Sequence, residues 1–266
     1  MTYITTDRDE LLHRLAEAGQ RFTRLAGSVP PDTRARASDW TARDVVAHVL
    51  TVVRRYTTRD LDSWDGLSST PAEVNEQNAA ELAALVDVGM DDLVAELRKE
   101  LETLTAIYRE VDLDASYRFH FRTEIDGYGG LGNMIGELLV HGYDIARGAG
   151  RPWPIDDRDA QLVLNGILQV ADGVLDPLAT AGLDLSVLWR IGEARAMLHL
   201  EHGRGGFIDP ADGPARPDVV IGGPPAATLL SLYGRIGTFE AARRGVLVRG
   251  GRRPWRALGI DRLFLR

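Results

Sequence analysis

The spacing of the apolar residues changes once along this 266-residue chain, and that change limits the folds open to it. Up to about residue 148 the apolar residues recur at helical spacing, whereas beyond residue 185 they alternate as in half-buried strands. A cluster of glycine and proline over residues 148–154 separates the two parts, as a helix stop followed by a linker would. We therefore expect a helical domain over residues 1–152 and a smaller α+β domain over residues 153–266.

Four long helices are expected in the first part, and together they indicate a four-helix bundle. Residues 6–9 have the pattern of a capping box, so a first helix is expected to open there and to stop near Gly27. Thr41 and Asp44 form a clearer capping box, and the helix after them is apolar nearly all round, which predicts deep burial. The other elements expected are a short helix after Pro71, long helices over residues 90–111 and 131–147, and a long connection over residues 112–130.

The second part has the pattern of strands mixed with helices. Residues 186–191 and 194–201 are both strand-like, and a tight Gly-Glu turn is expected to join them into a hairpin. The other elements expected are a helix over residues 157–174, short strands at 218–221 and 246–249, helical stretches near 226–233 and 254–258, and glycine turns at 203–206 and 250–251.

Composition excludes several classes of protein. The chain has no cysteine, which rules out disulfides, thiolate metal sites, iron–sulfur clusters and a cysteine nucleophile. Lys99 is the only lysine, and its place in an exposed helical pattern argues against a Schiff-base or phosphate-loop lysine. The net charge of −8 argues against nucleic acid as a partner. No apolar run approaches the roughly 20 residues of a membrane span, and the first ten residues lack the regions of a signal peptide, so we expect a soluble cytoplasmic protein without a membrane partner.

Polar residues within the apolar helical segments form the strongest candidate site. His48 interrupts the apolar helix, and Glu137 and His141 are four residues apart, which places them on one helix face. Two histidines and one carboxylate are the ligands of a catalytic zinc site whose fourth position stays open. Asp144 falls on the same face and suits a role behind the metal or as a base. The spacing alone also fits buried core histidines and an internal ion pair of Glu137 with an arginine, and it leaves these readings open.

Two segments carry a resemblance to a known family. Residues 40–48 read Trp-Thr-Ala-Arg-Asp-Val-Val-Ala-His, and residues 137–147 read Glu-Leu-Leu-Val-His-Gly-Tyr-Asp-Ile-Ala-Arg. Together they resemble the mycothiol-dependent maleylpyruvate isomerase family, whose N-terminal part is a DinB-like four-helix bundle. The resemblance covers residues 5–150, with Tyr143 standing where the family usually has tryptophan. It implies that Asp144 takes part in activity and that a divalent metal, usually zinc, is bound by His48, Glu137 and His141.

The second part resembles, through residues 222–235, the sterol-carrier-like α+β domain that accompanies this bundle in many family members. The family's arginine at the end of that segment is matched by Arg235 and is linked to catalysis, and an arginine suits a bidentate grip on a carboxylate. Residues 235–266 hold nine arginines and two acidic residues, and most of these arginines fit a solvated face. His120, in the long connection, would either reach the mouth of the metal pocket or be an ordinary surface histidine. Arg235 and His120 are the candidates for binding the thiol cofactor.

The resemblance implies an enzyme that uses zinc and a low-molecular-weight thiol, mycothiol in this family. The thiol would be transferred to an electrophilic small molecule, or it would add and leave again and so isomerise that molecule. We therefore expect an S-transferase or an isomerase whose partners are the thiol and the electrophile, and whose chain is a monomer or a homodimer. Two alternatives stay open, a hydrophobic-ligand binding protein with a structural metal and a metal-dependent hydrolase with metal-bound water.

Overall fold

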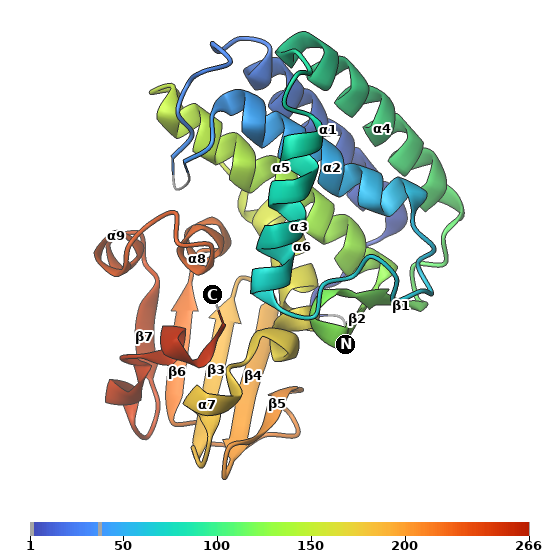
Figure 1. Cartoon of the computed structure of the whole chain (residues 1–266). Coiled ribbons are helices and arrows are strands. Elements are labelled where there is room, and N and C mark those ends of the chain that lie inside the picture. The colour runs from blue at the N-terminus through green and yellow to red at the C-terminus, as the bar shows by residue number, and fades with distance from the viewer. Residues whose placement is uncertain (1–2, 37–38, 266) are drawn as a thin grey trace.

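A computed structural model describes residues 3–36 and 39–265 of the chain. Helices form the N-terminal part, and a five-stranded sheet with short helices forms most of the C-terminal part (Figure 1). The expected fold class, a helical bundle followed by an α+β part, is therefore confirmed. Met1 and Arg266, the outer ends of the two predicted domains, lie outside the described residues, and the boundary between residues 152 and 153 stays a prediction.

The bundle consists of long helices near the expected positions. Thr41 caps the second of them, and its capping box with Asp44 is present as predicted. The first helix begins one residue later than expected, because Asp7 rather than Thr6 is its N-cap and accepts a hydrogen bond from the Glu10 backbone N–H. The helices are α1 (Arg8–Ala26), α2 (Ala42–Thr58), α4 (Met90–Glu110) and α5 (Gly127–Gly148), and the shorter α3 (Pro71–Ala84) packs against α2.

The connection expected over residues 112–130 is largely structured, which corrects the prediction. It contains an antiparallel hairpin of β1 (Ser116–Phe119) and β2 (Thr123–Asp126) around the 3-10 turn η1 (His120–Arg122). Helix α5 then begins four residues earlier than expected, because the Asp126 side chain caps it through the Gly129 backbone N–H. The glycines that suggested a helix break therefore belong to the first turns of α5.

Glycine in α5 also permits the next helix, α6 (Asp157–Val170), to approach closely. A Cβ atom on Gly132 would lie 2.2 Å from the carbonyl oxygen of Leu162. A Cβ atom on Gly136 would lie 2.7 Å from a methyl carbon of Val163. Helix α6 also packs against α8, so it connects the bundle with the C-terminal part.

The sheet has the strand order β5-β4-β3-β6-β7. The expected hairpin is confirmed as β3 and β4, which pair antiparallel, while β6 lies parallel to β3 on the other side. The interpretation of residues 203–206 as a turn was wrong beyond Gly203, because β5 runs through Gly205 and Gly206. A Cβ atom on Gly205 would lie 2.1 Å from the carbonyl oxygen of His199 in the neighbouring strand, so the close pairing of these strands requires the glycine. The strands are β3 (Leu185–Ile191), β4 (Ala194–Glu201), β5 (Arg204–Ile208), β6 (Val219–Gly223) and β7 (Leu247–Gly250).

Short helices complete the C-terminal part, and some of them were not expected. The unexpected elements are α7, α9 and the 3-10 turn η4, whereas α8 and η3 lie near the expected helical stretches. The helical elements are α7 (Pro177–Thr180), α8 (Pro225–Leu232), α9 (Thr238–Arg243), and the 3-10 turns η2 (Ala171–Val174), η3 (Pro254–Ala257) and η4 (Ile260–Leu263).

A continuous cluster of buried apolar side chains extends from α1 and α2 through α5 and α6 to β3 and β4. The bundle and the sheet therefore share a core through α6. Among the described residues, no helix is at once long enough and apolar enough to span a bilayer.

Candidate metal centre

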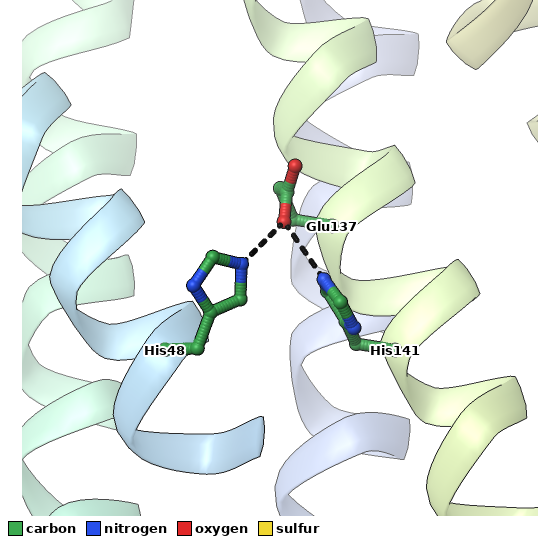
Figure 2. A group of neighbouring side chains, drawn as sticks. All are labelled: His48, Glu137 and His141. Carbon is green, nitrogen blue, oxygen red and sulfur yellow. Dashed lines mark ion pairs between the residues drawn. The ribbon is translucent and has the colours of Figure 1, made fainter. Parts of the chain in front are cut away.

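Two helices of the bundle bring two imidazoles and a carboxylate together. Helix α2 carries His48, and α5 carries Glu137 and His141 one turn apart (Figure 2). The Nε2 atoms of His48 and His141 lie 3.5 Å and 3.3 Å from the same oxygen, Oε2 of Glu137. Taking one ligand atom from each residue, all three atoms lie within 4.8 Å of one another. The structure thus places Glu137 and His141 on one helix face, as their spacing predicted, and it brings His48 from α2 beside them.

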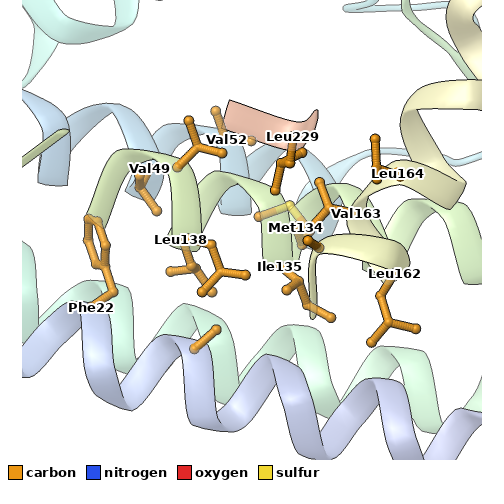
Figure 3. Packing of buried hydrophobic residues seen from close by; sticks show 14 of the residues in the cluster. Phe22, Val49, Val52, Met134, Ile135, Leu138, Leu162, Val163, Leu164 and Leu229 are labelled. Atoms are coloured by element: carbon orange, nitrogen blue, oxygen red, sulfur yellow. The ribbon is translucent and has the colours of Figure 1, made fainter. Parts of the chain in front are cut away.

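The helices that carry these side chains are fixed by the apolar core beside the site. Val49 of α2 lies next to His48 and belongs to the same buried cluster as Met134, Ile135 and Leu138 of α5 (Figure 3). Leu229 of α8 reaches this cluster from the C-terminal part. Side chains held on such packed helices keep their positions, which a metal site needs.

Several polar atoms of this group make no hydrogen bond of good geometry. Within the described residues, Glu137 Oε2, His48 Nδ1 and His141 Nδ1 are buried without a hydrogen bond, although Oε2 lies within ion-pair distance of both Nε2 atoms and His141 Nδ1 within such a distance of Asp144. A buried polar atom left in this state costs about 1–3 kcal/mol. A divalent cation between the two Nε2 atoms and Oε2 would satisfy the carboxylate oxygen, and two imidazoles with one carboxylate are a donor set of catalytic zinc sites. The residues present therefore fit a metal ion.

The protonation states of the three groups follow from burial and from their mutual contacts. Burial lowers the pKa of His48, which leaves this imidazole neutral and able to coordinate a cation. Burial also opposes the charged form of His141, but the carboxylates of Asp144 and Glu137 outweigh it and raise the pKa of His141 to about 9. Burial raises the pKa of Glu137, yet the two histidines outweigh it and hold this pKa far below its usual range. A metal ion would therefore displace a proton from His141.

Asp144 and Arg235 join this group to the C-terminal part. Asp144 is only 1% exposed, and its Oδ2 lies 3.4 Å from Nδ1 of His141. Arg235, in the turn after α8, donates from Nε to Oδ1 at 3.0 Å and from Nη2 to Oδ2 at 2.6 Å. Its Nη1 donates to the backbone oxygen of Tyr233 at 2.8 Å. A carboxylate on the second nitrogen of a ligating histidine fixes the orientation of that ring.

A cavity of about 250 Å³ adjoins the three residues. Trp40 stands at its edge, with its ring centroid 4.8 Å from that of His48. Sequence reasoning named Trp40 only as the first residue of the motif that ends at His48 and gave it no role in the site. It missed Asn78 and Tyr233, which come from α3 and from the residue after α8, because nothing in their local sequence marks them. The lining residues are Trp40, His48, Asn78, Gly136, Glu137, Val140, His141, Tyr233 and Arg235.

His120 is not among the residues that line this cavity. It lies at the turn of the β1–β2 hairpin, where its Nδ1 accepts a hydrogen bond from the Ser68 backbone N–H at 3.0 Å. Burial, together with the nearby charges of Arg55 and Arg59, lowers the pKa of His120 to about 4, so the ring is neutral. Its part in binding a cofactor stays a prediction.

Comparisons with known proteins bear on the fold and the family. Two crystal structures described as the mycothiol-dependent maleylpyruvate isomerase, one of them of a histidine-to-alanine mutant, have TM-scores of 0.52 and 0.54 with this chain. Each is 14% identical to it, and the matches cover 94% of this chain and 96% of the other, so they show a shared fold over nearly the whole length. No curated protein sequence gives a significant match. The family model described as the mycothiol maleylpyruvate isomerase N-terminal domain matches residues 12–146, and the chain belongs to that family.

Proposed function

We propose that the protein is a zinc-dependent enzyme that transfers a low-molecular-weight thiol to an electrophilic small molecule, or isomerises that molecule through the thiol. The observation that carries the proposal is the group of His48, Glu137 and His141, which lies beside a cavity and has buried polar atoms without a hydrogen bond. The family and the solved neighbours, both named for mycothiol and maleylpyruvate isomerase, support mycothiol as the thiol. Such a thiol stays reduced in the cytoplasm, where we propose that the enzyme works.

The chain's own residues divide the work around that cavity. A zinc ion held by His48, Glu137 and His141 would lower the pKa of a thiol at its open position, so that a thiolate forms near neutral pH. Asp144 does not line the cavity, and we assign it a positioning role, because it holds the His141 ring from behind and the Arg235 guanidinium from the side. Trp40 lines the cavity and packs against the His48 ring, which helps to hold that ring in place.

Arg235 is the residue that we propose to hold the electrophile. A guanidinium has five N–H donors, and within the described residues three of them serve Asp144 and the backbone oxygen of Tyr233. Two donors remain on a side chain that lines the cavity. A carboxylate is the group that such a pair binds best, so the electrophile is proposed to carry one.

The first experiment is elemental analysis for zinc in the parent protein and in the variant His141→Ala. The matched control is His199→Ala, which removes a histidine from β4, outside the lining of the cavity. We expect about one zinc per chain in the parent and the control, and much less in His141→Ala. A parent protein that gains no metal on reconstitution would overturn the proposal.

The role of the thiol is tested on protein in which cobalt replaces zinc. Addition of mycothiol is expected to produce the charge-transfer absorption of a cobalt–thiolate bond in the parent. Turnover of maleylpyruvate is then expected to require mycothiol. Product formation without any thiol would instead support the hydrolase, and the absence of both the absorption band and turnover would support a binding protein with a structural metal.

A further inference from the structure

Asn78 is the residue that α3 contributes to the cavity, and its side chain is held by an arginine from α2. Arg55 Nη2 donates to Asn78 Oδ1 at 2.6 Å. Because a guanidinium can only donate, this contact requires the amide oxygen to face Arg55 and the amide nitrogen to face away. Within the described residues, the hydrogen bond made by the Asn78 side chain is the one at Oδ1, so the two N–H groups of Nδ2 are available to a ligand in the cavity.

The arginine is itself fixed in this position. Arg55 donates to both carboxylate oxygens of Glu81, from Nε at 3.0 Å and from Nη2 at 2.5 Å. Gln77 Nε2 donates to the same carboxylate at 3.1 Å. None of the residues of α3 is fully buried, so these polar contacts, more than apolar packing, set how the helix faces the cavity. The orientation of Asn78 is therefore built into the polar attachment of α3.

The cavity then offers hydrogen-bond donors from two separate elements. The remaining N–H groups of Arg235 come from the turn after α8, and those of Asn78 come from α3. The volume of about 250 Å³ is below the roughly 300–1,000 Å³ of pockets that enclose drug-sized ligands. A short molecule with acceptor oxygens at both ends satisfies the two donor groups.

We propose that Asn78 is a specificity-determining residue that donates a hydrogen bond to an oxygen of the electrophile, at the end opposite the carboxylate held by Arg235. A short molecule with an acceptor oxygen at each end is therefore the probe that tests this contact. This inference rests on the proposed function. The alternative is that Asn78 only ties α3 to Arg55 and never meets the substrate.

The test uses two unreactive probes, succinate and succinamate, titrated calorimetrically into the zinc-loaded protein. Asn78→Asp keeps an oxygen for Arg55 to donate to, but it replaces the two N–H donors with a second acceptor. We expect N78D to bind succinate at least about ten-fold more weakly than the parent, because a hydrogen bond to a charged group is lost. We expect it to prefer succinamate, whose amide can donate to the new carboxylate, so that the order of the two affinities is inverted.

Two further variants complete the design. Asn78→Leu removes donor and acceptor together and is expected to weaken the binding of both probes. Asn75→Asp places the same charge at an exposed position of α3, and its affinities are expected to stay within about two-fold of the parent. Zinc content is measured for every variant and is expected to be unchanged.

The outcomes separate this inference from the proposed function. Succinate affinity that is unchanged in N78D, or affinities for both probes that fall in the same ratio, would overturn the role of Asn78. A zinc-loaded parent that binds neither probe would also overturn it. The cobalt–thiolate absorption band does not involve Asn78. If either of these results is obtained while the cobalt-loaded protein still shows the band, this inference alone is rejected. If the band is missing from the parent, the proposed function is rejected.

Discussion

Replacing Arg235 with methionine is expected to lower the free energy of unfolding by about 3 kcal/mol. The Asp144 side chain is 2% exposed and the Arg235 side chain 17% exposed, so their ion pair is largely hidden from water. Removing one member of a buried pair costs about 3–5 kcal/mol, because the other charge stays buried without its partner. The lower end applies here, since His141 Nδ1 lies 3.4 Å from Asp144 and this histidine, with its pKa raised to about 9, carries a compensating proton.

The assay is urea unfolding of the metal-free protein at pH 7, followed by circular dichroism. The double variant Asp144→Asn with Arg235→Met removes both charges and is expected to recover at least half of the loss. The control is Arg243→Met on α9, an exposed arginine whose replacement is expected to change stability by less than about 0.5 kcal/mol. A loss below about 1 kcal/mol in the single variant, or a double variant no more stable than it, would refute this reasoning.

Three further predictions concern packing, pH and metal. Gly132→Ala is expected to cost about 3 kcal/mol in urea unfolding, because its Cβ would lie 2.2 Å from a backbone oxygen of α6. Gly27→Ala is the control and is expected to be nearly neutral, because Gly27 is exposed, has a helical backbone and has room for a Cβ. Burial and nearby arginines lower the pKa of His120 from 6.5 to about 4, so a proton binds this histidine more tightly in the unfolded chain than in the folded one. The free energy of unfolding is therefore expected to fall by about 2 kcal/mol as the pH drops from about 6.5 to 4, and the variant His120→Asn is expected to lack this contribution. A chelator is expected to lower the melting temperature of the zinc-loaded parent, and added zinc is expected to restore it, whereas neither is expected to change the melting temperature of Glu137→Gln. A parent protein whose melting temperature changes with neither the chelator nor zinc would contradict the metal site.

The elements that the sequence predicted well are those whose signals are local. The capping box of Thr41 and Asp44 depends on residues within one turn, and the structure has α2 begin there. Alternation over residues 194–201 likewise predicted β4 with its bounds. The relation of Glu137 to His141 follows from helix geometry alone, and the structure places them on one face.

The elements that the sequence did not predict depend on contacts between distant segments. Gly129 was placed before the predicted helix because glycine disfavours helices by intrinsic preference, yet it belongs to α5, where Gly166 and Gln169 of α6 approach it closely. Gly205 belongs to a strand because β4 approaches it too closely for a side chain. Asn78 lines the cavity while Arg55 of α2 holds its amide oxygen, and no local pattern in the sequence contains that long-range contact.

The ion pair between Asp144 and Arg235 has a consequence for the order of events during synthesis. The two residues are 91 positions apart, so at about 5–20 residues per second several seconds separate their emergence from the ribosome. In that interval His48, Glu137 and His141 have already been synthesised, while the guanidinium that neutralises Asp144 is still to come. A cation bound to the unfinished chain would have the unpaired carboxylate of Asp144 behind His141, whereas in the finished chain Arg235 neutralises that carboxylate.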